Sequence, residues 1–174
     1  MDSFVIVKPS GKSANPKTAA WAQSECDHAI LHWHKQFRGE ARVCNDLALT
    51  PADAAQSNLI LFGDPSSNTI LAQIADKLPI QWKEGKLTVG DKTFDATHHM
   101  PALIFPNPLN PNRYVVLNSG FTFREFDYLN NARQIPRLPD YAIIDVDSPV
   151  TPKAPGKIVE AGFFDEHWRL PKSE

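Results

Sequence analysis

The stretch NLILFGDPSSNTILAQIADKLP (residues 58–79) joins an apolar run, a tight turn and a helical pattern, and this succession decides the expected fold class. The run at 58–63 is apolar almost throughout, as expected for a central strand that is covered on both faces. The residues from 65 to 78 predict a helix, because apolar side chains recur at helical spacing, at Ile70, Leu71, Ile74 and Leu78. A buried strand followed by such a helix is typical of a parallel α/β sheet.

Elements of the same kinds are expected on both sides of this stretch. Strands are predicted at 4–7, 41–45, 101–106, 113–120, 141–146 and 157–164, and a β-hairpin at 80–96. Helices are predicted at 16–38, at 50–56 and for about ten residues from Thr122. Helices between buried strands imply right-handed crossovers. We therefore expect one three-layer α/β domain over residues 1–174, Rossmann-like or flavodoxin-like, with a mixed, mostly parallel sheet and antiparallel edge strands.

The size and composition of the chain narrow the classes of function. A chain of 174 residues can bury one substantial core, and its 42% hydrophobic and 22% charged residues argue against disorder. The net charge is −2 and no basic stripe exists, which disfavours nucleic-acid binding. No apolar run approaches the roughly 18 residues of a membrane-spanning helix, and the N-terminal residues indicate a strand rather than a signal peptide. A soluble chain with no membrane partner is expected, and its short approach to the first strand would suit a fragment of a longer polypeptide.

Three loops should gather at the carboxyl ends of the parallel strands, where sheets of this class bind their ligands. These loops cover residues 8–15, 63–68 and 118–122. A polar or anionic ligand at this edge would face a set of polar side chains: Ser10, Lys12, Ser66, Asn68, Asn118, Ser119 and Arg124.

The turn GDPSSN (63–68) has two interpretations. Asp64 precedes a proline and is therefore pushed toward the extended backbone of a helix N-cap, and Pro65 suits the first helical position. The amides of Ser66 and Ser67 are the donors that a phosphate would use, yet the Asp64 carboxylate is placed to accept from them. A structural turn is favoured, and an anion site remains the alternative.

Other stretches with possible chemistry lack part of their pattern. PSGKS (9–13) ends like a phosphate-binding loop, but the first glycine of that motif would fall at Ile6, inside a strand. Ser119 could occupy a strand-to-helix elbow, but Leu117 stands where the first glycine of G-x-S-x-G should be. No catalytic residue is predicted.

The histidines and cysteines predict neither a metal nor another cofactor. His28 and His32 have a spacing that can hold zinc, but no third ligand is evident, and they lie opposite the Ile30 and Trp33 face, which predicts a solvated surface. The adjacent histidines at 98–99 should point to opposite sides of a strand. Cys26 and Cys44 are predicted to be buried free thiols. If the chain is exported, a disulfide between them is the alternative.

Several stretches resemble a known kind of domain: FRGEARV (37–43), NLILFGDPSSN (58–68), ADKLPIQW (75–82), FPNPLNPNRYVVLNSGFTFREFDYLNNARQIP (105–136) and PGKIVEAGFFDEHW (155–168). Together they resemble the C-terminal domain of large bacterial hydrolase-like proteins of the planctomycete type. Those proteins have a prolyl-oligopeptidase-like or esterase-like α/β-hydrolase region upstream. The resemblance implies that the catalytic serine belongs to that upstream region and that the parent protein is exported to the periplasm or the cell exterior.

The leading expectation is a non-catalytic accessory domain, whose partner is the upstream hydrolase domain of a peptidase-like protein. The alternative is a small-ligand-binding or hydrolytic domain that uses the polar carboxyl edge of the sheet. A third possibility is a structural module that forms homo-oligomers through its last edge strand.

Overall fold

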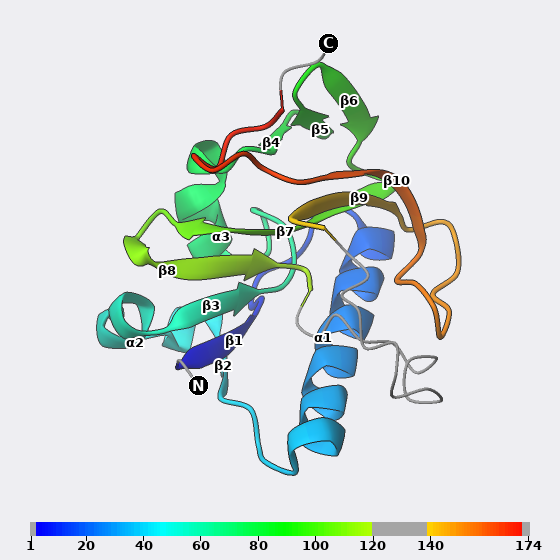
Figure 1. Ribbon diagram of the computed structural model, residues 1–174. Coiled ribbons are helices and arrows are strands. Elements are labelled where there is room, and N and C mark those ends of the chain that lie inside the picture. Colours follow the sequence, from blue (N-terminus) through cyan, green and yellow to red (C-terminus); the bar gives the residue numbers. More distant parts are fainter. Residues whose placement is uncertain (1–2, 120–138, 172–174) are drawn as a thin grey trace.

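The computed structural model describes residues 3–119 and 139–171. The expected helix from Thr122 therefore lies outside the described residues. Figure 1 shows the elements in order along the chain. The helices are α1 (Pro16–Phe37), α2 (Pro51–Gln56) and α3 (Thr69–Ile74), with 3-10 turns η1 (Asp46–Ala48) and η2 (Ala75–Lys77). The strands are β1 (Phe4–Lys8), β2 (Val43–Asn45), β3 (Asn58–Leu61), β4 (Gln81–Lys83), β5 (Lys86–Val89), β6 (Lys92–Asp95), β7 (His99–Asn107), β8 (Asn110–Leu117), β9 (Tyr141–Asp145) and β10 (Lys157–Gly162).

Seven of these strands form one mixed sheet in the order β10-β9-β7-β8-β3-β1-β2. The neighbours β2, β1, β3 and β8 run parallel to one another. The neighbours β8, β7, β9 and β10 alternate in direction. Parallel and antiparallel pairings therefore share the sheet equally, and β10 lies at one edge, as the sequence predicts.

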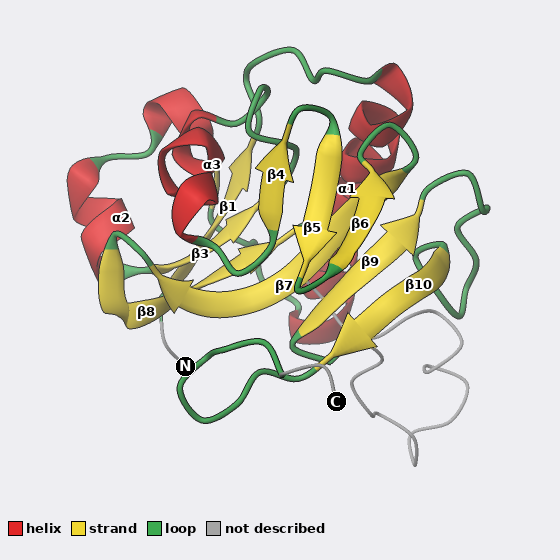
Figure 2. Cartoon of the chain, turned by 90° about the horizontal axis from the view of Figure 1, so that it is seen from above, coloured by secondary structure: helices red, strands yellow, loops and turns green. Residues whose placement is uncertain are grey.

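The expected fold class, a three-layer Rossmann-like or flavodoxin-like domain with a mostly parallel sheet, is wrong. Residues 81–95 do not extend the main sheet as an edge hairpin; they form a second sheet of three antiparallel strands, β4-β5-β6. This small sheet lies over one face of the main sheet beside α3 (Figure 2), where a Rossmann-like fold would place further helices. Alternating apolar residues indicate that one face of a strand is buried, but not which element buries it.

The core lies on both faces of the main sheet, because successive residues of a strand point to opposite sides. Val5 and Val7 of β1 pack with residues of α3 and β5, whereas Ile6 packs with Cys26 and Ala29 of α1. The strand β3 repeats this division: Leu59 and Leu61 belong to the first group, Phe62 just after it to the second. The continuous apolar run at 59–62 is thus explained by a strand that is covered on both faces.

The long helix α1 begins where the sequence predicts, and its buried side includes Cys26, whereas Ile30 and Trp33 are only half-buried. Asn15 caps it, since its side-chain oxygen accepts from the amides of Lys17 and Thr18. Its left-handed C-terminal residue is Arg38, with φ 59°, rather than Gly39.

The prediction that the two histidines of α1 lie on a solvated surface is wrong. His32 is 2% exposed, and its ring stacks on that of His28 at 4.0 Å between centroids. Conversely, the large apolar residue Phe37 at the end of α1 is 46% exposed. The buried stripe includes the small residues Ala22 and Ala29. Small side chains allow a helix to approach a sheet closely, which explains why the stripe is rotated from the one marked by the largest apolar residues.

The two cysteines are free thiols. Cys26 is buried and Cys44 is half-buried, so the prediction of burial is correct for the first and overstated for the second. Burial raises the pKa of the Cys26 thiol to about 11, which leaves it protonated and unreactive at neutral pH. Within the described residues, no helix has the length and apolar character needed to cross a membrane.

Candidate functional site at the carboxyl edge of the sheet

Two of the three loops expected at the carboxyl edge are tied to each other by hydrogen bonds. The Gly11 amide donates to the Ser67 carbonyl at 2.8 Å, and the Ala14 amide donates to the Ser66 hydroxyl oxygen at 2.9 Å. The Ser13 hydroxyl donates to the Asp64 carboxylate. The loop after β1 is therefore held against the loop after β3.

The carboxylate of Asp64 is the centre of this contact. Its Oδ1 atom accepts from the Ser66 amide at 2.9 Å, the Ser66 hydroxyl at 2.6 Å and the Ser67 amide at 2.9 Å, while Oδ2 accepts from Ser13. Asp64 is only 5% exposed. Burial by itself raises the pKa of this carboxyl, but the hydrogen bonds from Ser13, Ser66 and Ser67 outweigh it and hold the pKa below its usual value. The donors that an anion would need are engaged by the protein's own acid.

The helix after this turn starts later than the sequence predicts. It begins at Thr69, and its N-cap is Asn68, whose Oδ1 accepts from the amides of Ile70 and Leu71 at 3.1 Å each. The Asn68 side-chain amide also donates to the Phe62 carbonyl at 3.0 Å. Both Asp64 and Asn68 are good capping residues; the first closes a turn over 64–67 and the second caps the helix. Asn68, predicted as a ligand contact, is 1% exposed and serves the fold.

Asn118 connects the third loop to the other two. Its Oδ1 accepts from the Gly63 amide at 2.8 Å, and its Nδ2 donates to the carbonyls of Gly63 and Pro101 at 3.0 and 3.2 Å. Asn118 has φ 50° and is 1% exposed. Its side chain therefore joins the ends of β3, β7 and β8, and it does not face a ligand.

The close approach of the loops depends on Gly63. Its φ is 104°, and a Cβ atom built there would lie 2.6 Å from the Ser67 hydroxyl oxygen and 3.2 Å from Cβ of Pro9. A side chain at this position would collide with the neighbouring loop. Little room is left between the first two loops.

The remaining predicted site residues do not form one group. Ser10 is exposed and hydrogen-bonds the buried Asp46, which also accepts from the Thr69 amide at 2.6 Å. Lys12 is exposed and Ser119 is half-buried. The structure therefore gathers the three loops, but uses Ser66, Asn68 and Asn118 for internal contacts. The last predicted residue lies outside the described part of the chain: Arg124.

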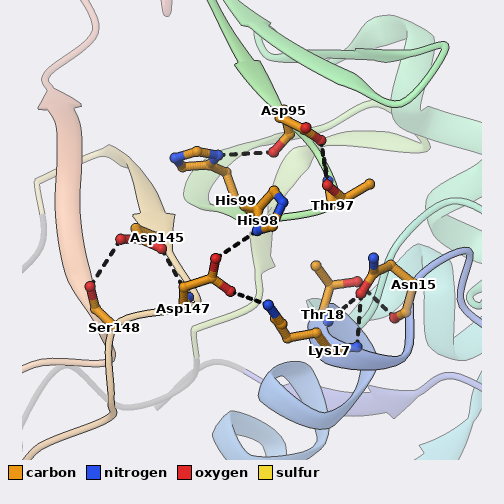
Figure 3. A network of polar contacts seen from close by, with 10 residues as sticks. All are labelled: Asn15, Lys17, Thr18, Asp95, Thr97, His98, His99, Asp145, Asp147 and Ser148. Carbon is orange, nitrogen blue, oxygen red and sulfur yellow. Dashed lines mark hydrogen bonds and ion pairs between the residues drawn. The ribbon is translucent and has the colours of Figure 1, made fainter.

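A second polar group, absent from the predicted site, lies farther along the same edge. Figure 3 shows Lys17 and His98 pointing at Asp147 from two sides. The Lys17 ammonium lies 2.5 Å from one carboxylate oxygen, and Nδ1 of His98 lies 2.6 Å from the other. The hydrogen bonds from Lys17 and then from His98 hold the pKa of Asp147 below its usual value. These contacts tie the start of α1 and the turn before β7 to the end of β9.

Because Nδ1 of His98 is bound to a carboxylate, Nε2 is the ring nitrogen that could accept a proton. This is the arrangement of a general base. Within residues 3–119 and 139–171, no hydroxyl or thiol is recorded as bonded to that nitrogen. His99 donates instead to the Asp95 carbonyl at 2.9 Å, so the two adjacent imidazoles have different partners. The sequence contains no signal for the His98–Asp147 pair, because 49 residues separate its members.

Comparison with known proteins adds no relative. No family model matches the chain, and no curated protein or solved structure matches it.

Proposed function

We propose that this chain is a non-catalytic accessory domain of a larger hydrolase- or peptidase-like protein, in which an upstream α/β-hydrolase domain carries out the chemistry. The observation that carries the proposal is the saturation of Asp64. Four donors from Ser13, Ser66 and Ser67 surround its carboxylate. Asp64 is therefore a hydrogen-bonded cross-link between two loops rather than a free acid available for catalysis.

The polar residues beside Asp64 support the same proposal. Asn68 caps α3 and Asn118 joins three strand ends, and both are almost fully buried. A reacting group needs access to its substrate and hydrogen-bonding capacity that is not already used. These side chains have neither, whereas a domain whose role is to present a fixed shape needs rigid loops.

The proposal is tested in the parent protein by removal of the domain. The full-length protein and a version lacking this domain are compared for turnover, substrate range and thermal stability. We expect a loss in at least one of these properties. If the hydrolase domain alone matches the full-length protein in all three, the accessory role is refuted.

The alternative, a hydrolytic role at the carboxyl edge, is favoured by one observation, the His98–Asp147 pair. The variant His98→Gln keeps a side chain that can donate to Asp147 but removes the basic nitrogen. If the accessory role is correct, this variant of the parent protein retains full activity. A loss of turnover with unchanged stability would establish the alternative instead.

A further inference from the structure

A cavity of about 300 Å³ lies between the turn that joins β5 to β6, the end of β10, and the segment at Leu170 and Pro171. Tyr141, the first residue of β9, forms part of its wall. Tyr141 pairs with Leu103 of β7, and the register continues through β8 to Leu61 at the end of β3. The strands β7 and β8 therefore separate this cavity from the Asp64 loops. Its volume is at the lower end of the range for small-molecule sites.

The hydroxyl group of Tyr141 is the first feature that suggests a ligand. Tyr141 is 6% exposed, and no hydrogen bond joins its hydroxyl to any residue in 3–119 or 139–171. The hydroxyl oxygen is not itself fully buried, so it can meet a group in the cavity, and the phenol of a mostly buried tyrosine normally has a hydrogen-bond partner. The ring already has a structural role, since it lies beside Gly162, its partner in β10, and 5.3 Å from the ring of Phe164. That role needs the ring only, and the hydroxyl is left for another group.

Gly162 keeps the space beside this hydroxyl open. A Cβ atom at Gly162 would lie 2.5 Å from the Tyr141 hydroxyl oxygen, so any side chain there would close the wall. Glycine in an edge strand weakens the strand unless its lack of a side chain is used. Here that lack leaves the phenol accessible from the cavity.

The charges of the wall define the chemistry of the ligand. The Lys92 ammonium lies 2.6 Å from one oxygen of Glu160, which leaves the second oxygen as an acceptor. Asp91 also lines the cavity, so the wall carries two carboxylates and one ammonium, a net charge of −1. An anion would be repelled, whereas a cation would gain from the second oxygen of Glu160.

We propose that this cavity binds a small monocation that also carries hydroxyl groups, such as an amino sugar. The ammonium group of the ligand binds Glu160, a ligand oxygen accepts from Tyr141, and the carbon face of the ring lies on Val89 and Leu170. The volume equals that of about ten water molecules, which suits one sugar ring. This binding role goes beyond the accessory function, and neither depends on the other.

The test uses three probes that share a hexose ring and differ in charge: glucosamine, glucose and glucuronate. Each is titrated into the ¹⁵N-labelled chain at slightly acidic pH, where the amine is protonated. Saturable shifts of the amides of Gly90 and Gly162 are the readout. We expect glucosamine to bind, glucose to bind more weakly and glucuronate to leave these amides unchanged. No saturable shift with glucosamine, or equal affinity for glucuronate, overturns the proposal.

Two variants and one control assign the binding to named groups. Tyr141→Phe keeps the ring on Gly162 and should lower the affinity for glucosamine by about threefold to tenfold. Glu160→Gln keeps the shape and should lower it by about tenfold or more, because a charged hydrogen bond is lost. Tyr114→Phe removes a hydroxyl on an exposed tyrosine and should change nothing. Wild-type affinity in both Tyr141→Phe and Glu160→Gln overturns the proposal, and the second variant remains informative if the first is unstable.

Discussion

The Ser13 hydroxyl donates a hydrogen bond to the Asp64 carboxylate across 51 residues of sequence, and this bond ties the loop after β1 to the loop after β3. It joins two segments that the parallel pairing of β1 and β3 already brings to the same edge. The contact therefore fixes the geometry of the edge, while the pairing of β1 and β3 brings the two loops together.

Ser13→Ala should lower the free energy of unfolding by about 2 kcal/mol, because a buried carboxylate loses one of its donors. Urea denaturation of the isolated chain measures this change. Ser24→Ala on the exposed side of α1 is the matched control and should change stability by less than about 0.5 kcal/mol. Equal effects of the two substitutions would contradict the role assigned to Ser13.

The Asp64 carboxylate should make stability depend on pH in the acid range. Its pKa is lower in the folded chain than in the unfolded chain, so its contribution is present at neutral pH and is lost as the pH falls below about 4 and through the folded-state pKa. We expect wild type to be more stable than Asp64→Asn at neutral pH, and the difference to shrink toward acid pH.

Denaturation curves at several pH values measure this difference. Asp76→Asn, at an exposed position, provides the background for the loss of a carboxylate. A gap between wild type and Asp64→Asn that stays constant down to acid pH would show that the hydrogen bonds to Asp64 do not stabilise its charge.

Asn68→Ala should cost at least about 2 kcal/mol, because it removes both the cap of α3 and the donor to the buried Phe62 carbonyl. Asn15→Ala removes only a cap, that of α1, and should cost about 1 kcal/mol. Thermal or urea unfolding compares the two. If Asn68→Ala cost less than Asn15→Ala, the helix start at Thr69 would be in doubt.

Gly63→Ala and Gly85→Ala separate backbone strain from crowding. Both glycines have positive φ, at 104° and 72°, but a Cβ atom meets neighbouring atoms only at Gly63. Gly85→Ala should cost about 1 kcal/mol through its left-handed backbone alone. Gly63→Ala should cost clearly more, because the added methyl group collides with Ser67 and Pro9. Equal losses of stability would show that the loops can separate without cost.

Local pattern was sufficient for much of the fold. The helical spacing of α1 and the apolar run of β3 placed both elements to within a few residues, and the helix expected at 50–56 is found as α2. The loops at the carboxyl edge also meet as expected, because parallel strands bring their carboxyl ends to one side. These features depend on residues that are near one another in sequence or on the direction of neighbouring strands.

Other features depend on partners that no local pattern names. The alternating residues of β5 show one buried face, but only the fold reveals that this face covers the main sheet rather than extending it. Both Asp64 and Asn68 could cap the helix by sequence. The loop from Gly11 to Ala14 hydrogen-bonds the turn after Asp64, and the helix starts after Asn68. For the same reason the Lys17–Asp147–His98 group and the cavity at Tyr141 were not predicted.

The order of strands in the main sheet determines what a shortened chain would expose. On the side of β1 away from β2, the strands of the sheet follow one another almost in sequence order: β3, then the β7–β8 hairpin, then β9 and β10. A product cut just before Tyr141 would therefore leave β7, nine residues long and largely apolar, as an unprotected edge. Such an edge recruits strands from other copies and promotes aggregation. A separate peptide that carries β9 and β10 should occupy that edge, which makes this junction a natural place to split the chain for fragment complementation.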